Sequence, residues 1–197
     1  DLYEYGYRTI KVKVGTADFT QEIDGARALL ADTPEDIRLR FDANQGYTLE
    51  KASRFCDMIG SMDASHRVEY LEQPLPVHEW AAVRELNALK ALPIMLDESI
   101  VGFSDIERAI ESGSAFIKLK LCKCGGPSQL LSMATKAWQH DLRVVMGNGV
   151  STDVGCLCEA MLVSSQPDLF YGAFEGVGTA RIEVPVLLNP PRIIGGY

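Results

Sequence analysis

Apolar and polar positions alternate along the chain with two different periods. Short runs rich in valine, isoleucine and leucine with a period of two are typical of strands, whereas longer stretches with apolar residues three and four positions apart are typical of helices. Helices are predicted at residues 17–32, 48–62, 76–90, 103–113, 126–140 and 153–165. Strands are predicted at residues 8–15, 37–42, 68–72, 93–97, 115–121, 142–147 and 168–174. Such regular alternation indicates a parallel sheet wrapped by helices.

The placement of polar residues favours a closed barrel over an open sheet. An open doubly wound sheet usually carries a glycine-rich phosphate loop after its first strand, and residues 14–17 do not have that sequence. Polar residues end at least four of the predicted strands, and a barrel gathers the carboxyl end of every strand around one mouth. We therefore predict an α/β fold of the TIM-barrel type.

The length of the chain indicates an incomplete barrel. A full eightfold barrel needs about 250 residues, whereas the chain has 197 residues, in which seven strands are predicted. Residues 1–7 are predicted to be the end of a helix closed by Gly6, with no strand before it. The first strand is thus expected to be missing or to be supplied by another segment. We predict a single domain over residues 1–197, with a proline-rich extension from about residue 180.

Composition and charge exclude several classes of protein. The formal net charge of -8 argues against nucleic-acid binding, which usually needs a basic face, and more weakly against binding to anionic membranes. No apolar run approaches the roughly 20 residues of a membrane span, and the amino terminus has no signal-peptide pattern. Five cysteines are an odd number in a chain without a secretion signal, so we expect them to be reduced. A cytoplasmic protein is the resulting expectation.

Three carboxylates end successive predicted strands. Glu72 is followed closely by Pro74, which cannot continue a strand ladder, so Glu72 lies at the end of its strand. Asp42 and Asp97 also lie at the ends of their predicted strands. Oxygen ligands without histidine favour Mg²⁺ over zinc, so we predict that the three converge on one divalent cation. The alternative for each residue is helix capping, which fits Glu72 less well because a proline follows. Further polar side chains that could support the site are Asn44, Glu98 and Ser99.

Two strands carry pairs of lysines on one face. Lys11 and Lys13 lie two positions apart, and Lys118 and Lys120 repeat this spacing four strands later. The residues that alternate with the first pair are apolar and suit the helix layer, which directs both lysines into the barrel. Lysines in a like-charged, partly desolvated setting have lowered pKa values and can serve as general bases. The alternative is that they are solvated lysines at strand ends.

The cysteines offer a different interpretation. Cys122 with Cys124, and Cys156 with Cys158, form two Cys-x-Cys pairs that could suggest a zinc-binding module. Cysteines two positions apart on a strand or helix rarely converge as a Cys-x-x-Cys pair does. Small core residues are therefore the better interpretation of these cysteines.

Five motifs in a fixed order carry a resemblance to a known family. They are KVKVG at 11–15, FDANQG at 41–46, LEQPL at 71–75, LDES at 96–99 and KLKLCKCGG at 118–126. Together they resemble the enolase superfamily, and within it the muconate lactonizing enzyme-like subgroup of dipeptide epimerases, o-succinylbenzoate synthases and N-acylamino acid racemases. The resemblance implies a modified (β/α)7β barrel, here without its first strand and without the family's N-terminal capping domain.

The resemblance also implies roles for individual residues. Asp42, Glu72 and Asp97 would hold Mg²⁺, or Mn²⁺ in its place. Lys13 would be one acid/base, with Lys11 assisting it by holding charge near the substrate carboxylate.

On the opposite strand the aligned residue is Lys120, with Lys118 as the competing assignment. Lys123 is expected to pair with an acid such as Glu98. The segments 146–152 and 174–178 differ from the pattern of the dipeptide epimerases. They add two candidates for substrate binding or support of the site, Asn148 and Glu175.

The implied activity is Mg²⁺-dependent removal of the α-proton of a small carboxylate substrate through an enediolate. Two opposed lysines would give racemisation or epimerisation of an amino acid derivative or dipeptide, and one acting base would give cycloisomerisation. β-Elimination, as in the acid-sugar dehydratases of the superfamily, is the alternative reaction. A catalytically silent barrel fragment is the alternative outside enzymes. We expect a homo-oligomeric isomerase that binds neither nucleic acid nor membranes.

Overall fold

The structure is a computed structural model that describes residues 3–16, 18–176, 183–190 and 192. Its centre is a six-stranded, all-parallel sheet in which the strands follow one another in sequence order. The strands are β1 (Thr9–Lys13), β2 (Arg38–Asp42), β3 (Val68–Glu72), β4 (Ile94–Leu96), β5 (Phe116–Leu119) and β6 (Arg143–Met146). The helices are α1 (Phe19–Asp32), α2 (Leu49–Gly60), α3 (Trp80–Ala88), α4 (Phe103–Glu111), α5 (Pro127–Trp138) and α6 (Asp153–Ser165), with a short 3₁₀ helix, η1 (Asp63–Arg67), before β3.

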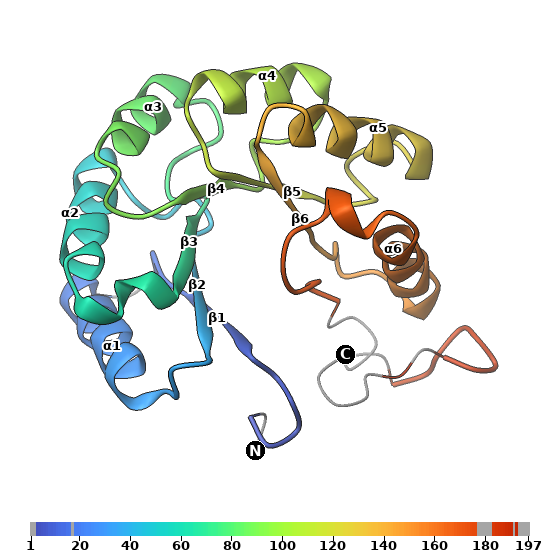
Figure 1. The fold of residues 1–197 in the computed structure, drawn as a ribbon, viewed down its shortest axis with the longest axis horizontal. Coiled ribbons are helices and arrows are strands. Elements are labelled where there is room, and N and C mark those ends of the chain that lie inside the picture. The colour runs from blue at the N-terminus through green and yellow to red at the C-terminus, as the bar shows by residue number, and fades with distance from the viewer. Residues whose placement is uncertain (1–2, 17, 177–182, 191, 193–197) are drawn as a thin grey trace.

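The sheet is curved into a half-barrel. Figure 1 shows the strands along an arc, with the helices arranged around its outer side. All six predicted helices and the first six predicted strands are confirmed, mostly with shorter bounds. Within the described residues, no strand pairing joins β1 to β6. The half-barrel therefore opens between its first and last strands.

The seventh predicted strand, at residues 168–174, is wrong. A 3₁₀ helix, η2 (Pro167–Leu169), begins the segment, which then runs beside β6. The Tyr171 N–H donates to the Val144 carbonyl at 2.7 Å, but the next carbonyl on that side of β6, Met146, accepts from the Glu175 N–H at 3.1 Å. Between these two hydrogen bonds the chain advances by two residues in β6 but by four residues in this segment. The extra residues form a bulge, in which Gly172 has a φ of +64°.

The two ends of the chain also differ from expectation or lie outside the described residues. Gly6 donates its N–H to the Tyr3 carbonyl at 3.0 Å, so residues 3–6 form a turn and not the end of a helix. Residues 1–2 and 177–179 lie outside the described residues, as do residues 180–182, 191 and 193–197 of the predicted proline-rich extension. Among the described helices, none combines the length and apolar character needed to cross a membrane.

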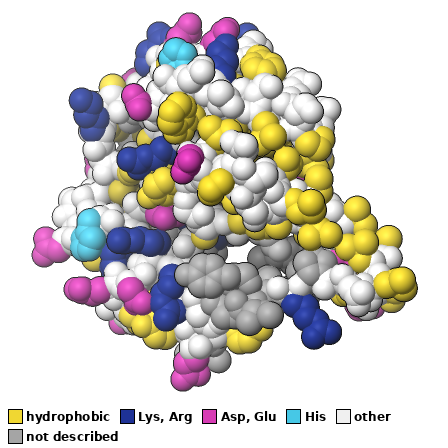
Figure 2. All heavy atoms as spheres, turned by 45° about the vertical axis from the view of Figure 1, so that its right-hand side comes forward, with side chains coloured by type: hydrophobic (Ala, Val, Ile, Leu, Met, Phe, Trp, Pro, Cys, Tyr) yellow, Lys and Arg dark blue, Asp and Glu magenta, His cyan; other side chains and the backbone are white. Residues whose placement is uncertain are grey.

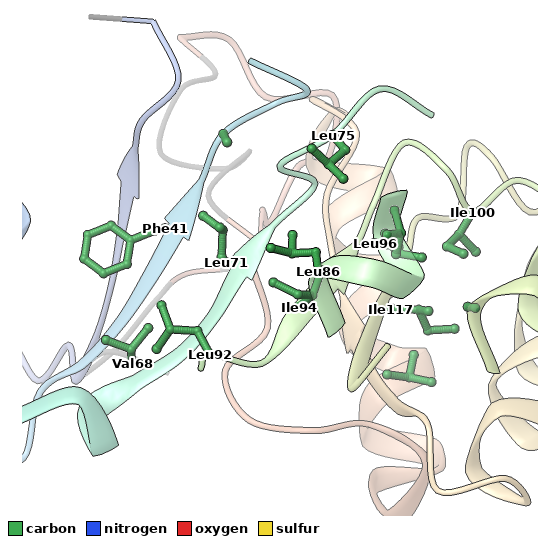
Figure 3. Packing of buried hydrophobic residues seen from close by; sticks show 14 of the residues in the cluster. Phe41, Val68, Leu71, Leu75, Leu86, Leu92, Ile94, Leu96, Ile100 and Ile117 are labelled. Atoms are coloured by element: carbon green, nitrogen blue, oxygen red, sulfur yellow. The ribbon is translucent and has the colours of Figure 1, made fainter. Parts of the chain in front are cut away.

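The main hydrophobic core lies between the sheet and the helices. Alternate strand residues point outward into it, and Phe41, Leu71 and Ile94 on β2, β3 and β4 are fully buried. Leu86 on α3 packs into the same cluster (Figure 3). Burial of one such side chain contributes about 1.5–3 kcal/mol, so this layer is the main source of stability.

The inner face of the half-barrel has a second, smaller apolar cluster. Tyr70, Met95, Phe116 and Val145 are buried together, one from each of β3 to β6. The rings of Tyr70 and Phe116 lie 5.1 Å apart. These residues form an apolar floor, and the inward residues that follow them toward the carboxyl ends of the strands are mostly charged. The fold thereby places charge at one end of a dry interior.

Helix α6 has acidic side chains on its buried side and apolar side chains on its exposed side, in addition to apolar residues in the core. Its buried residues include Asp153 and Glu159, whereas Val154, Leu157 and Met161 are exposed. Yellow apolar side chains accordingly gather on the side of the molecule that Figure 2 brings forward. Cys156 and Leu162 of α6 are also buried, so this helix is apolar on both sides and differs from an ordinary amphipathic surface helix.

The core predicts a difference between two leucines of one helix region. Leu86→Ala should lower the free energy of unfolding by about 2–5 kcal/mol, because the side chain is 2% exposed and its loss leaves a cavity. Leu89→Ala, three positions later and 47% exposed, is the matched control and should change it by about 0.5 kcal/mol or less. Urea unfolding of both variants measures this. Equal effects would contradict the assigned packing of α3.

Candidate active site

The carboxyl ends of the strands bring lysines and carboxylates to one level of the inner face. The register pairs Lys13 with Asp42, and Asp42 with Glu72, across β1, β2 and β3. Asp97 directly follows β4, two positions after the inward-facing Met95. Lysines of β1 therefore lie on one side of a row of three carboxylates, and Lys118 on β5 and Lys120 directly after it lie on the other. We call Asp42, Glu72 and Asp97 the carboxylate row.

The β1 lysines contact the first two members of the row. Lys11 Nζ lies 2.8 Å from Asp42 Oδ2 and 2.8 Å from Glu72 Oε1. Lys13 Nζ lies 2.7 Å from Asp42 Oδ2 and also donates to the side-chain oxygen of Asn44. The Asn44 backbone N–H donates to Asp42 Oδ1 at 3.1 Å. Asp42 is thus held by both β1 lysines and by its own loop.

The lysines of β5 and the loop after it contact the other end of the row. Lys118 Nζ lies 2.6 Å from Glu72 Oε1, so Glu72 is shared between β1 and β5. Lys120 Nζ lies 2.5 Å from Asp97 Oδ2. Lys123 lies 2.7 Å from Asp97 Oδ1 and 2.6 Å from its carbonyl oxygen. Lys123 thus pairs with an acid as expected, but the acid is Asp97 and not Glu98, the example given.

Glu175 joins the cluster from the segment after β6. Its Oε2 lies 3.1 Å from Lys11 Nζ and 2.7 Å from Lys118 Nζ. Its Oε1 accepts from Arg40 Nη1 at 3.1 Å and from the Tyr70 hydroxyl at 3.2 Å. The sequence interpretation missed Arg40 and Tyr70. The available signal was their spacing, because each lies two positions before a member of the carboxylate row and so faces the same side of its strand.

The two remaining predicted residues, Glu98 and Asn148, have different surroundings. Glu98 accepts from the Asn44 side-chain amide at 2.9 Å and so lies beside the site. The amide of Asn148 donates to Glu159 Oε2 at 2.5 Å and to the Ser151 hydroxyl at 2.8 Å, and not to a member of the carboxylate row. These contacts place Asn148 in the polar connection between β6 and α6, where it holds the start of the helix.

Gln73, which was not predicted, fixes the loop that carries Asp97. Its side-chain oxygen accepts from the backbone N–H groups of Asp97 and Ser99 at 3.0 and 3.1 Å. Its amide donates to the Ser99 hydroxyl at 2.8 Å. Gln73 is fully buried, and its position beside Glu72 in the LEQPL motif is the only sequence signal for this role. The described loops after β3 and β4 are thus joined through one side chain.

Burial and charge shift the pKa values of the lysines in opposite directions. Burial lowers the pKa of Lys118 more strongly than Glu72 and Glu175 raise it, so its net pKa is lowered. Burial also lowers the pKa of Lys11, but the surrounding carboxylates outweigh this and its net pKa is raised. The pKa of Lys120 is raised in the same way by Asp97. The pKa of Lys118 is therefore lowered, whereas the pKa values of Lys11 and Lys120 are raised.

Burial and neighbouring charges also shift the pKa values of Glu72 and Asp97 in opposite directions. Burial raises the pKa of Glu72 to about 7, in spite of the neighbouring Lys118 and Lys11. For Asp97, burial is outweighed by the positive charges of Lys123, Lys118 and Lys120, which hold its pKa well below the usual range. The negative charge of Glu72, at the centre of the row, is therefore less well compensated by the protein than the charges of Asp42 and Asp97.

The donors in the site fit a hard cation. Glu72 Oε2 and Glu98 Oε2 are buried and have no hydrogen-bond partner among the described residues. Oxygen atoms from carboxylates are the ligands that Mg²⁺ prefers. The lysine ammonium groups stand among the same oxygens, and in the described part of the chain no three acidic, histidine or cysteine side chains surround a common ion position. A cation bound to these oxygens of Asp42, Glu72 and Asp97 would therefore displace lysines that contact them, Lys11 and Lys120 among these.

The cysteines lie elsewhere and in different environments. Cys124 and Cys156 are buried, Cys158 is half-buried and Cys122 is exposed. The interpretation of all four as core residues is therefore wrong for Cys122. Its sulfur lies where a side chain at Gly149 would stand, so the loops after β5 and β6 touch there.

A glycine at the end of β6 makes room for the β5 lysines. A Cβ atom placed on Gly147 would lie 2.6 Å from Lys118 Cδ and 3.2 Å from Lys120 Cε. These distances are too short for any other residue without displacement of both lysine side chains. Gly147 therefore helps to define where Lys118 and Lys120 lie.

Comparison with known proteins identifies relatives along the whole chain. The family model described as enolase C-terminal domain-like matches residues 1–197. L-Ala-D/L-Glu epimerase from Francisella tularensis subsp. novicida is 33% identical over 158 residues, covering 80% of this chain and 41% of that protein. o-Succinylbenzoate synthase from Mycobacterium leprae is 31% identical over 201 residues, covering 98% and 54%.

Comparison with solved structures also finds members of this family. The crystal structure of muconate cycloisomerase from Pseudomonas fluorescens matches with a TM-score of 0.85 at 25% identity, covering 97% of this chain and 52% of that one. The chain spans about half the length of the curated relatives it matches. The family resemblance given by the five motifs is confirmed. The chain belongs to the enolase superfamily, among its muconate lactonizing enzyme-like members.

Proposed function

We propose that the chain forms the catalytic part of a Mg²⁺-dependent enzyme that removes and returns the α-proton of a small carboxylate substrate. The observation that carries this proposal is the placement of lysines from β1 and from the end of β5 and the loop after it on opposite sides of the carboxylate row. Two opposed bases can act on the two faces of one carbon, which gives racemisation or epimerisation. The similarity to an L-Ala-D/L-Glu epimerase supports an amino acid derivative or dipeptide as substrate.

Exposure distinguishes the two lysines within each pair. The side chain of Lys13 is 62% exposed and that of Lys11 is 26% exposed. The side chain of Lys120 is 22% exposed, whereas that of Lys118 is fully buried. A group that exchanges protons with a substrate must reach it, so we assign Lys13 and Lys120 as the acid/base residues.

The inner lysines have a different role in this proposal. Lys11 and Lys118 share Glu72 and Glu175 and hold positive charge at the closed end of the site. Removal of an α-proton adds negative charge to the substrate carboxylate as an enediolate forms. Fixed cations in a site with little water stabilise that charge without reorganisation.

Asp42, Glu72 and Asp97 are the residues that would hold the metal. Mg²⁺ would supply positive charge to the substrate carboxylate and so increase the acidity of the α-proton. Asn44 and Glu98 would support this site from the side of β2 and β4. We further infer that the half-barrel is part of a closed barrel, since the matching muconate cycloisomerase chain is about twice as long.

The assignment of the two bases predicts face-specific loss of exchange. With Mg²⁺ in D₂O, Lys13→Ala and Lys120→Ala should each abolish deuterium incorporation at the α-carbon on one face. The rate on that face should fall by at least about 100-fold, which is the lower range for general acid–base catalysis. NMR of a panel of dipeptides, N-acylamino acids and acid sugars measures the exchange.

Lys136→Ala is the matched control, because that lysine pairs with Glu107 on the helix layer. It should retain exchange on both faces. Exchange retained on both faces in both active-site variants would refute the assignment. A chain that catalyses exchange with no member of the panel would favour a catalytically silent barrel.

The metal assignment predicts a loss of Mg²⁺ affinity that can be measured without turnover. Glu72→Gln removes one negative charge at a fully buried position and should weaken Mg²⁺ binding by at least about tenfold. Isothermal titration calorimetry gives the affinity, and the Mg²⁺-dependent rise in melting temperature gives an independent readout. Glu85→Gln, on the exposed side of α3, should bind as the unaltered chain does. Equal affinity in both variants would exclude Glu72 as a ligand.

A further inference from the structure

Arg40 lies beneath the carboxylate row and contacts the segment that follows β6. Its side chain is 1% exposed, and its Nε lies 2.5 Å from Glu69 Oε2. Its Nη1 donates to the carbonyl oxygen of Ala173 and to Glu175 Oε1, both at 3.1 Å. Its guanidinium carbon lies 5.1 Å from the centre of the Tyr70 ring. One guanidinium on β2 thus joins β3 to a segment that is distant in sequence.

The two carboxylate oxygens of Glu175 accept hydrogen bonds from different sets of residues. Oε1 accepts from Arg40 and from the Tyr70 hydroxyl. Oε2 accepts from Lys11 at 3.1 Å and from Lys118 at 2.7 Å. Because one rigid carboxylate makes both sets of contacts, its position relative to the lysines depends on the groups that bind Oε1.

The backbone of the segment is held by few sheet contacts. Tyr171 and Glu175 donate their N–H groups to β6, and the bulge at Gly172 separates these two hydrogen bonds. A Cβ atom on Gly172 would lie 3.2 Å from Arg40 Nη2, so the bulge packs directly on the guanidinium. Arg40 therefore supports the segment across the half-barrel at the point where the sheet does not.

We propose that Arg40 is a positioning residue, which holds Glu175 where its carboxylate fixes Lys11 and Lys118 beside the carboxylate row. This inference rests on the proposed function, because the placement of the lysines matters for catalysis only if they act on a substrate. A lysine at position 40 would keep the charge, but its single ammonium lacks the planar fork that serves Glu69, Ala173 and Glu175 together.

The first test follows the segment itself and needs no substrate. In Arg40→Met, the amide hydrogens of Tyr171 and Glu175 should exchange at least about tenfold faster, because their local stability falls. Amides of β3 should be unaffected. Arg67→Met is the matched control: Arg67 is 3% exposed and donates to the carbonyls of Thr33 and Pro34, far from this segment. It should destabilise the chain without selectively raising exchange at the two amides.

The second test asks whether Arg40 acts through Glu175. Arg40→Met should lower kcat for α-proton exchange by about 10- to 100-fold, the effect of losing one hydrogen bond to a charged group, with little change in KM. Glu175→Gln should have a comparable effect. In the double variant the losses should not add, because both changes interrupt the same connection. Arg67→Met should leave kcat unchanged, and Arg40→Lys should recover part of the lost rate.

The outcomes separate this inference from the proposed function. Unchanged amide exchange at Tyr171 and Glu175 in Arg40→Met would overturn the inference, as would fully additive losses of kcat. Faster amide exchange with an unchanged kcat would also overturn the positioning role. Absence of α-proton exchange in the unaltered chain would refute the proposed function, while the amide measurement would still decide whether Arg40 holds the segment. If Arg40→Met does not fold, Arg40→Lys, with smaller expected changes, is used for both comparisons.

Discussion

The buried charge of Glu72 is the constraint on which the rest of the structure depends. A carboxylate removed from water is costly unless cations reach it, and Glu72 is fully buried. Lys11 from β1 and Lys118 from β5 both contact the same oxygen of Glu72, so strands on the two sides of the half-barrel must hold a fixed separation. The other oxygen has no partner among the described residues. Lysines thus contact Oε1 of Glu72, whereas Oε2 has no hydrogen-bond partner in the described part of the chain.

The inner face is organised around this requirement. An apolar floor from β3 to β6 excludes water below Glu72, which strengthens every charge interaction above it. Above the floor, the three carboxylates of the row lie on, or directly after, neighbouring strands, and lysines contact the row from both sides. The half-barrel has no strand pairing between β1 and β6 in its described residues. Glu175 connects these two sides instead, through contacts with Lys11 and with the β6 backbone.

Much of this arrangement could be predicted from the sequence, because strand periodicity assigns each side chain to a face. Alternation around Lys11 and Lys13 gave the correct inward direction for both, and the residues that end the strands meet at one level because the sheet is parallel. The pattern could not give the partners, since contacts between distant strands depend on curvature and loop length. An acidic partner was therefore expected for Lys123 without the correct residue, Asp97, being identified, and Arg40 was missed. The strand at 168–174 failed because a bulge at Gly172 changes the register, which apolar periodicity does not reveal.

The central claim is that one divalent cation binds among lysines at the end of this half-barrel. Crystals grown with Mn²⁺ in place of Mg²⁺ and measured for anomalous scattering test it most directly. The account predicts one anomalous peak within coordination distance of Asp42, Glu72 and Asp97, with at least one of Lys11 and Lys120 turned away from its carboxylate. An anomalous peak at the cysteines alone, or lysine–carboxylate contacts unchanged by saturating Mn²⁺, would contradict it.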